Sequence, residues 1–138
     1  MAEAKPEVHP DFNKKSSTSM EPKIAVIIAH IGALFSWVGL GWLSGLIIYL
    51  IEKENKFVKF HAMQSLVIGI VEVGVAIISW IVIFVTVGFG AFVCAPLLAI
   101  VLVATFVIRI VIVIKAYNGE YYKFPWFGVW AEKWMGKF

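Results

Sequence analysis

Three long apolar stretches dominate the pattern of the chain, and short polar or glycine-containing segments separate them. The stretches cover residues 24–51, 60–87 and 91–114. Apolar runs of about 20 residues or more are typical of transmembrane helices. Strands of a membrane β-barrel would instead alternate polar and apolar residues over about 10 positions. The pattern therefore predicts an all-α integral membrane protein.

The first stretch allows two interpretations. As one straight helix it would be about 42 Å long, whereas the hydrocarbon core of a bilayer is about 30 Å thick. It is either one tilted helix, which gives three spans, or a hairpin of two short helices broken near residues 39–41, which gives four. Glycine at Gly39 and Gly41 is compatible with both, because membrane helices tolerate it.

The distribution of lysines favours the hairpin. Lysines in short loops mark the cytoplasmic side of a membrane. They occur before the first stretch, in the connector at residues 52–59 and after the last stretch, whereas the turn at residues 88–90 carries no charge. We therefore expect a compact bundle of four transmembrane helices, the first two short. The protein would be multi-pass in the cell (plasma) membrane, with its N- and C-termini in the cytoplasm.

The two ends of the chain differ from this bundle in composition. Residues 1–22 are polar and mixed in charge, and they are predicted to form a disordered tail. Residues 23–123 form the predicted transmembrane helical domain, and residues 124–138 form an aromatic interfacial tail.

The C-terminal tail has the spacing of an amphipathic helix. Aromatic residues recur at every fourth position on one face and two lysines share another, namely Trp126, Trp130, Trp134 and Phe138, and Lys133 and Lys137. Lysines beside tryptophans suit the headgroup region, so an interfacial helix on the membrane surface is favoured. The alternative is a tail helix packed against its own bundle.

Composition excludes several function classes. The chain of 138 residues is 61% hydrophobic and only 15% charged, whereas soluble domains average about 25% charged residues. Its net charge of +3 comes from lysines that flank the apolar runs, which is typical of membrane anchoring and not of nucleic-acid binding. The single cysteine, Cys94, cannot form an intrachain disulfide.

Three ionisable residues interrupt the apolar stretches: His30, Glu72 and Arg109. Such residues are costly inside a bilayer and often functional. In the four-helix arrangement all three could meet in the cytoplasmic half of the bundle as an intramembrane polar cluster. Glu72 and Arg109 would then form a structural ion pair that fixes helix register. The alternatives are a proton or ion pathway through His30 and Glu72, and an Arg109 side chain that reaches the interface alone.

Other patterns carry less chemistry. His61, Gln64, Ser65 and Glu72 lie within one stripe of a helix, where they could form hydrogen bonds between helices. The segment 41–45 has a small residue at each end, a pattern typical of close helix contact, of a hinge or of chance in a glycine-rich span. Catalytic motifs and a histidine-based metal site are not indicated. We therefore expect a non-enzyme that uses no cofactor or metal.

Two segments resemble a known family. The first is residues 49–65 and the second is residues 115–125. The motif positions in them are Phe57, Phe60, His61, Gln64, Gly119, Tyr122 and Pro125. Together with His30 they resemble a widespread family of small prokaryotic membrane proteins of unknown function, named for its similarity to the twenty-kilodalton inner-envelope component of chloroplast protein import. The resemblance covers about residues 24–134 and implies a four-helix membrane domain with both ends cytoplasmic, but no reaction.

These observations predict a small non-enzymatic membrane protein with a structural, assembly or translocation-associated role through helix contacts in the bilayer. Its partners would be the lipid bilayer and other membrane proteins or copies of itself, and not nucleic acid. The alternative is a small transporter or channel for ions or protons that uses the polar cluster. A weaker rival is a membrane-bound enzyme that acts on lipid.

Overall fold

The structure is a computed structural model that describes residues 8–136, and within them every regular element is helical. In chain order the elements are the 3-10 helix η1 (Pro10–Asn13), α1 (Pro22–His30), the 3-10 helix η2 (Ile31–Val38), α2 (Leu43–Ile51), α3 (Lys56–Val85), α4 (Ala91–Tyr117) and α5 (Phe127–Met135). An isolated antiparallel bridge joins Val8 to Glu120.

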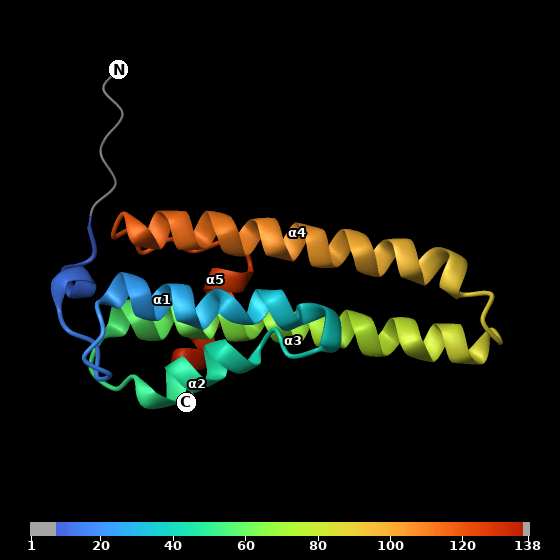
Figure 1. Ribbon diagram of the computed structural model, residues 1–138, viewed down its shortest axis with the longest axis horizontal. Coiled ribbons are helices and arrows are strands. Elements are labelled where there is room, and N and C mark those ends of the chain that lie inside the picture. The colour runs from blue at the N-terminus through green and yellow to red at the C-terminus, as the bar shows by residue number, and fades with distance from the viewer. Residues whose placement is uncertain (1–7, 137–138) are drawn as a thin grey trace, which may run out of the picture.

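The helices α3 and α4 form the long axis of the molecule. They have 30 and 27 residues, which correspond to lengths of about 45 and 40 Å. Both are long and apolar enough to cross a membrane. They run antiparallel and are joined by a tight turn, where Gly88 has a φ of +93° that favours glycine (Figure 1).

The first apolar stretch forms a hairpin. The helix α1 continues into η2, which ends at Gly39 with a φ of +79°, and α2 then returns alongside. At the tip of this hairpin, Gly41 lies against Ser36 and Glu72, and the backbone of Trp42 lies against Gly69. Both contacts are near the middle of α3. The stretch is therefore broken at residues 39–41, as the lysine distribution favours, and its two arms cover only part of α3.

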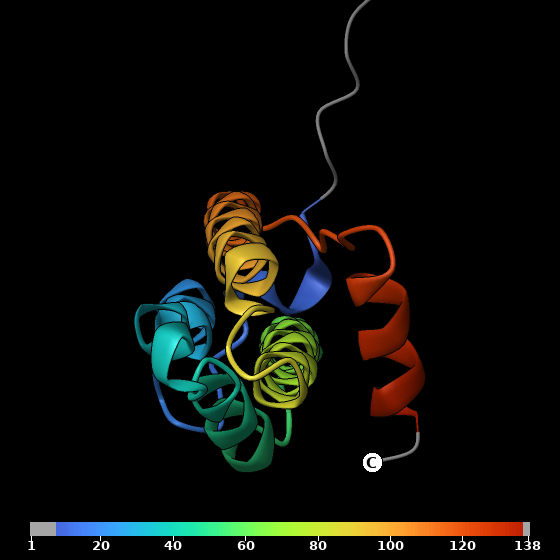
Figure 2. The ribbon, with the colours of Figure 1, turned by 90° about the vertical axis from the view of Figure 1, so that its right-hand side faces the viewer.

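In place of the expected four transmembrane helices, the structure has two helices of spanning length and a shorter helical hairpin packed against them. Length and composition identify only α3 and α4 as candidate spans among residues 8–136, because α1 and η2 together have the length of a short apolar helix. Viewed along the axis, α1, α2 and α4 surround one side of α3, and α5 covers the other (Figure 2).

The molecule divides at the tip of the hairpin. We call the hairpin with residues 56–72 of α3 and 109–117 of α4 the connector half, and residues 73–108 the distal half. The hydrophobic core lies in the connector half and in the segment that docks on it. Its largest members are Phe57, Phe60, Met63 and Tyr49.

The N-terminal segment differs from the prediction of a disordered tail over residues 1–22. Residues 1–7 lie outside the described residues, but residues 8–21 pack against the connector. Phe12 contacts the core, and the side-chain amide of Asn55 donates to the carbonyl oxygens of Asp11 and Lys14 at 2.9 and 2.7 Å. The polar residues that suggest disorder here form hydrogen bonds with Asn55 at the buried start of α3. A local sequence pattern does not reveal such contacts between distant segments.

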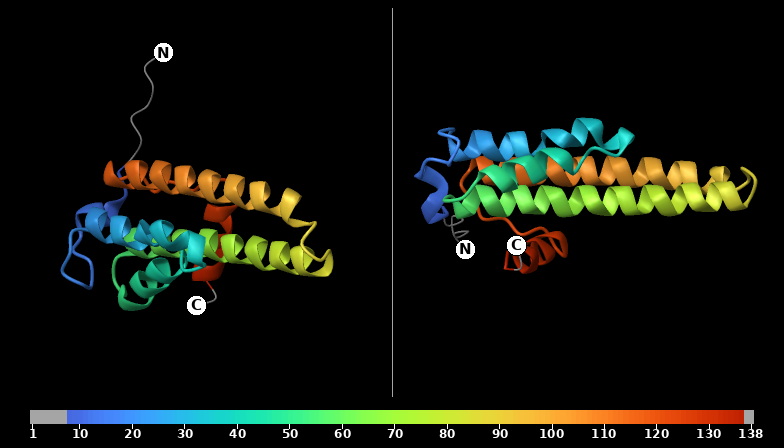
Figure 3. Two further views of the ribbon diagram at one scale, coloured as in Figure 1. Left: turned by 45° about the vertical axis from the view of Figure 1, so that its right-hand side comes forward. Right: turned by 90° about the horizontal axis from the view of Figure 1, so that it is seen from below.

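The C-terminal segment forms α5, which crosses the bundle steeply on the α3 side (Figure 3). The small residues Gly128 and Ala131 are buried against α3, and Trp134 packs on the core. Trp126 is 75% exposed and precedes the helix, with a φ of +68°. The predicted aromatic face is therefore divided: Trp126 and Trp130 are exposed, whereas Trp134 packs on the core.

The outer side of α5 keeps the features of an interfacial anchor. Trp130 and Lys133 are exposed there, beside the exposed Trp126. Lys137 and Phe138, which the sequence places in the same helix, lie outside the described residues. The helix thus packs against its own bundle with one side, and its opposite side is exposed.

Candidate functional site

A buried arginine joins three parts of the connector half. Arg109 of α4 is only 2% exposed. Its Nη1 donates to the Ser65 hydroxyl at 2.6 Å, and its Nη2 donates to the Gly41 carbonyl oxygen at 3.1 Å and to the Glu72 carboxylate at 3.4 Å. The guanidinium therefore fastens α4 to α3 and to the turn of the hairpin. It does not reach the interface alone, so snorkelling is excluded for this side chain.

The partner carboxylate is also shared with the hairpin. Glu72 Oε2, which is paired with Arg109 at 3.4 Å, accepts a second hydrogen bond from the Ser36 hydroxyl at 2.7 Å. Glu72 is 4% exposed. An isolated charge is expensive inside a bilayer, and here two opposite charges and a hydroxyl meet. The structure thus brings together the predicted Glu72–Arg109 pair.

Two serines complete the polar contacts between the helices. The carbonyl oxygen of Ala29 accepts from the hydroxyls of Ser44 at 2.8 Å and Ser65 at 2.6 Å, and the Gly32 N–H donates to Ser44 Oγ at 2.9 Å. Ala29 and Gly32 flank the change from α1 to η2, where backbone groups need other partners in a lipid environment. Sequence reasoning missed Ser36 and Ser44. The sequence feature that could have identified these two serines is their position as small polar residues inside an apolar run.

His30 is not hydrogen-bonded to this cluster. The side chain is 4% exposed, and neither ring nitrogen has a partner. It lines a cavity of about 220 Å³ between α1, η2 and α4, together with Arg109. The structure therefore places all three predicted cluster residues in the same half of the bundle, but only Glu72 and Arg109 are in direct contact.

The small residues of the hairpin allow close packing on α3. A Cβ atom on Gly45 would lie 2.8 Å from the Ala62 carbonyl oxygen and 2.8 Å from the Leu66 nitrogen. Any larger side chain would push α2 away from α3. Gly45 of α2 thus marks a close helix contact. Gly41 lies before α2, in the turn of the hairpin, as the hinge interpretation of this pattern predicts.

The motif residues of α3 hold the segment that follows α4. His61 Nε2 lies 3.2 Å from the Glu120 carbonyl oxygen. The Gln64 side chain donates to the Tyr122 carbonyl oxygen at 3.3 Å and accepts from the Phe124 N–H at 3.0 Å. We call residues 119–125 the strap. The Gln64 side chain therefore donates to the strap backbone and also accepts from it, as the backbone of a neighbouring strand would. The two separate motif segments meet in one contact, which explains why histidine and glutamine occur at this spacing.

Aromatic stacking strengthens this contact. Phe60 stacks on Tyr121 with ring centroids 4.0 Å apart, and Phe57 meets His61 edge to face at 4.7 Å. Burial, followed by the nearby Glu132 carboxylate, raises the pKa of Tyr121. Gly119 has a φ of +84°, and a Cβ atom there would collide with Val8.

The other motif positions contribute less. Tyr122 contacts Gln64 only through its backbone carbonyl oxygen. Pro125 is exposed and precedes α5. The role of Pro125 is therefore confined to the start of the C-terminal helix.

A buried carboxylate, Glu52, accepts several hydrogen bonds in the connector. The sequence does not single it out, because residues 52–59 contain several charged residues. Glu52 is 1% exposed. Its oxygens accept from the backbone N–H groups of Ser17, Glu54 and Asn55 and from the Ser17 hydroxyl, at 2.7 to 3.1 Å. Burial alone would raise the pKa of Glu52, but these donors outweigh it and hold the pKa below its ordinary value.

The arrangement is suited to holding helices together. Among residues 8–136 no group of three or more His, Cys, Asp or Glu side chains could hold a metal ion. The charged side chains of the site are fixed by helix-to-helix hydrogen bonds. The geometry therefore pairs buried charges and links α3, α4 and the hairpin through hydrogen bonds.

Comparison with known proteins assigns the family. A family model described as the magnetosome magnetite crystal formation protein family matches residues 21–131. The chain belongs to this family. The matched region contains the whole connector half, the distal half and most of α5. The comparisons support a family of small membrane proteins, and they give no support to the link with the chloroplast import component.

Curated relatives come from archaea. Two UPF0132 membrane proteins of Methanocaldococcus jannaschii are 38% identical, one over 72% of this chain and 65% of its own length, the other over 88% of this chain and 96% of its own. A UPF0132 membrane protein of Archaeoglobus fulgidus is 34% identical over 70% of this chain and 86% of its own length. The chain thus spans slightly less than two thirds of the first relative. No solved structure matches.

Proposed function

We propose that this protein is a non-enzymatic structural component of the membrane. It would act in assembly, or in a translocation-associated complex, through helix contacts in the bilayer. The observation that carries this proposal is the unequal covering of α3 and α4. In the connector half, α3 is covered by the hairpin, α4 and α5, whereas in the distal half both helices expose large apolar side chains such as Phe84, 87% exposed, and Phe92, 83% exposed.

The distal half has the surface of a helix pair that meets neighbours in a membrane. Its only buried residues are small: Ser79, Cys94 and Thr105. Small residues allow two membrane helices to approach closely, while large apolar ones face lipid or another helix. A second membrane protein, or a second copy of this chain, would pack against these faces.

We further propose that the connector end faces the cytoplasm, so that the protein sits in the plasma membrane as a multi-pass protein with both termini inside. The lysines of the connector and of the strap support this orientation. The Gly88 turn would then face the opposite side. In this orientation the Glu72–Arg109 pair lies within the bilayer, and the outer side of α5 lies near the cytoplasmic headgroups.

Site-specific photocrosslinking in native membranes tests the proposed contacts. A photoreactive side chain at position 84 or 92 is expected to give adducts of a defined protein mass. The same group at position 27 or 34, where exposed Ile27 and Leu34 belong to the connector half, serves as the control and is expected to capture lipid only. If neither distal position captures protein, the proposal is wrong.

A second candidate function is a small transporter or channel for ions or protons that uses His30, Glu72 and Arg109. Unpartnered polar atoms favour it, because both ring nitrogens of His30 and Oε1 of Glu72 are buried without a hydrogen bond. The variant His30→Ala separates the candidates, since the His30 side chain forms no hydrogen bond to another element. Proton or ion flux into liposomes that is lost in a folded His30→Ala protein would favour transport. Absence of flux in the parent protein would exclude it.

A further inference from the structure

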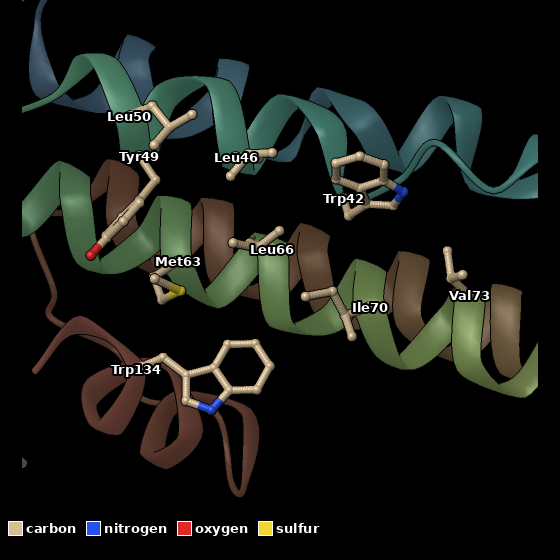
Figure 4. Close-up of a pocket in the computed structure, with 9 residues that line it drawn as sticks. All are labelled: Trp42, Leu46, Tyr49, Leu50, Met63, Leu66, Ile70, Val73 and Trp134. Atoms are coloured by element: carbon tan, nitrogen blue, oxygen red, sulfur yellow. The ribbon is translucent and has the colours of Figure 1, made fainter. Parts of the chain in front are cut away.

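An apolar groove of about 700 Å³ runs between α2, α3 and α5. Figure 4 shows the residues that line it: Trp42, Leu46, Tyr49, Leu50, Met63, Leu66, Ile70, Val73 and Trp134. The N–H and O–H groups among these side chains are the Tyr49 hydroxyl and the indole nitrogens of Trp42 and Trp134. The groove extends from the connector end, near Tyr49, toward the middle of α3.

The dimensions of the groove fit a single extended chain better than a helix. Met63 and Val73 lie ten positions apart on α3, so the groove is about 15 Å long. A helix is about 10 Å in diameter with its side chains, so one turn occupies roughly 400 Å³. The groove would hold less than two turns of a helix. A transmembrane helix of a second copy is about 30 Å long, so the groove would cover only about half of its length.

The connector end of the groove offers groups for a negatively charged head. The Tyr49 hydroxyl is buried and has no hydrogen-bond partner. Lys59 Nζ lies 5.0 Å from the centroid of the Tyr49 ring. In Figure 4 this end is opposite the end formed by Trp42 and Val73. One end thus combines a cation with an unused donor, while the rest of the groove is apolar.

We propose that this groove holds one acyl chain of an anionic phospholipid. The phosphate lies at the connector end, beside Lys59 and the Tyr49 hydroxyl. The apolar chain lies along α3, between α2 and the indole of Trp134. The assignment goes beyond the proposed structural role, because α5 then closes one wall of a lipid site in addition to covering α3.

Two matched variants of α3 test the assignment. Ile70 lines the groove, and Ile81 lies three turns further along nearly the same helix face, outside the groove. They are 42% and 57% exposed, so each position accepts a larger side chain. The parent protein, Ile70→Trp and Ile81→Trp are reconstituted in vesicles of equimolar phosphatidylglycerol and phosphatidylcholine. They are then released in mild detergent, and bound lipid is counted by native mass spectrometry.

The parent protein and Ile81→Trp are expected to retain one phosphatidylglycerol, at about five-fold preference over phosphatidylcholine. Ile70→Trp is expected to lose this lipid while remaining folded. Lys59→Gln is expected to keep one lipid but to lose the preference for phosphatidylglycerol. Equal retention by Ile70→Trp and Ile81→Trp, an absence of bound lipid in the parent, or a mass of two chains in place of the lipid adduct would each overturn the assignment. None of these outcomes depends on the crosslinking result at positions 84 and 92.

Discussion

The connector half and the distal half are built from the same two long helices, yet they are stabilised in different ways. In the connector half, α3 buries large aromatic residues and hydrogen-bonded polar groups, and the helices α1, α2, α4 and α5 pack against it. In the distal half, the same helix exposes its large residues and buries only Ser79. Two long apolar helices thus contain one half that is joined by buried polar groups and another half whose large apolar side chains are exposed.

This difference shows where polar residues stabilise the contacts between helices in a membrane bundle. Apolar side chains gain little by leaving lipid for a protein interior, because both surroundings are apolar. Hydrogen bonds and close packing therefore decide which helices stay together. Arg109, Glu72 and Gln64 all lie in the connector half. We expect substitutions there to be costly and matched substitutions in the distal half to be mild.

The largest effect is expected for the buried arginine. Arg109→Met leaves Glu72 as an uncompensated buried charge, which should cost about 3–5 kcal/mol of unfolding free energy. The double variant Glu72→Gln/Arg109→Met should recover most of this loss. Chemical unfolding in mixed micelles measures both. If Arg109→Met is as stable as the parent, the pair does not hold the bundle together.

A matched pair of phenylalanines compares the two halves directly. Phe60 is fully buried, and Phe84 is 87% exposed on the same helix. Phe60→Ala should cost about 3 kcal/mol through the cavity it creates and the loss of stacking on Tyr121. Phe84→Ala should change the unfolding free energy by less than about 0.5 kcal/mol. Equal effects in the same unfolding experiment would show that the halves are not distinct.

Loss of the motif glutamine should release the C-terminal segment. Gln64→Leu leaves the Tyr122 carbonyl and the Phe124 N–H unpaired, at a cost of about 1–3 kcal/mol. Hydrogen exchange should then show lost protection over residues 120–136. The distal comparison is Thr105→Val, because the Thr105 hydroxyl bonds only to carbonyl oxygens of its own helix. This variant should keep its exchange pattern.

The smallest effect concerns the connector and depends on pH. The pKa of Glu52 is lower in the folded protein than its ordinary value of 4.5, so its contribution to stability is present above that pH and is lost as the pH falls through the folded value. Glu52→Gln should cost about 1–2 kcal/mol at pH 7. The difference from the parent should disappear in strongly acidic buffer, as measured by thermal unfolding. Glu54→Gln, at an exposed position, is the control. A loss in Glu52→Gln that does not vary with pH would contradict this role of the carboxylate.

Much of the fold follows from simple rules on the sequence. The length of the apolar stretches predicts the helices α3 and α4, and the lysine distribution favours the hairpin. The pairing of Glu72 with Arg109 follows from the high cost of single charges in lipid. Each of these inferences rests on a physical constraint that acts locally or over whole segments.

The remaining features depend on contacts between distant residues. The sequence does not reveal that Ser17 and Asn55 tie the N-terminal segment to the connector, because polar composition alone suggests disorder. The expected meeting of His30 with the ion pair does not become a hydrogen bond, although His30 and Arg109 line the same cavity. The division of the tryptophan face follows from how α5 packs on the bundle, which buries Trp134 against the core and leaves Trp130 exposed.

The most direct test of the hairpin arrangement is the side of the membrane on which each end of the bundle lies. In a Cys94→Ala background, single cysteines at the exposed positions Lys15, Phe89 and Asn118 are labelled in sealed vesicles with a membrane-impermeant thiol reagent. The hairpin predicts that Lys15→Cys and Asn118→Cys are labelled from the same side and Phe89→Cys from the opposite side. Labelling of Lys15→Cys together with Phe89→Cys would contradict it, because the first stretch would then cross the membrane once, without a hairpin.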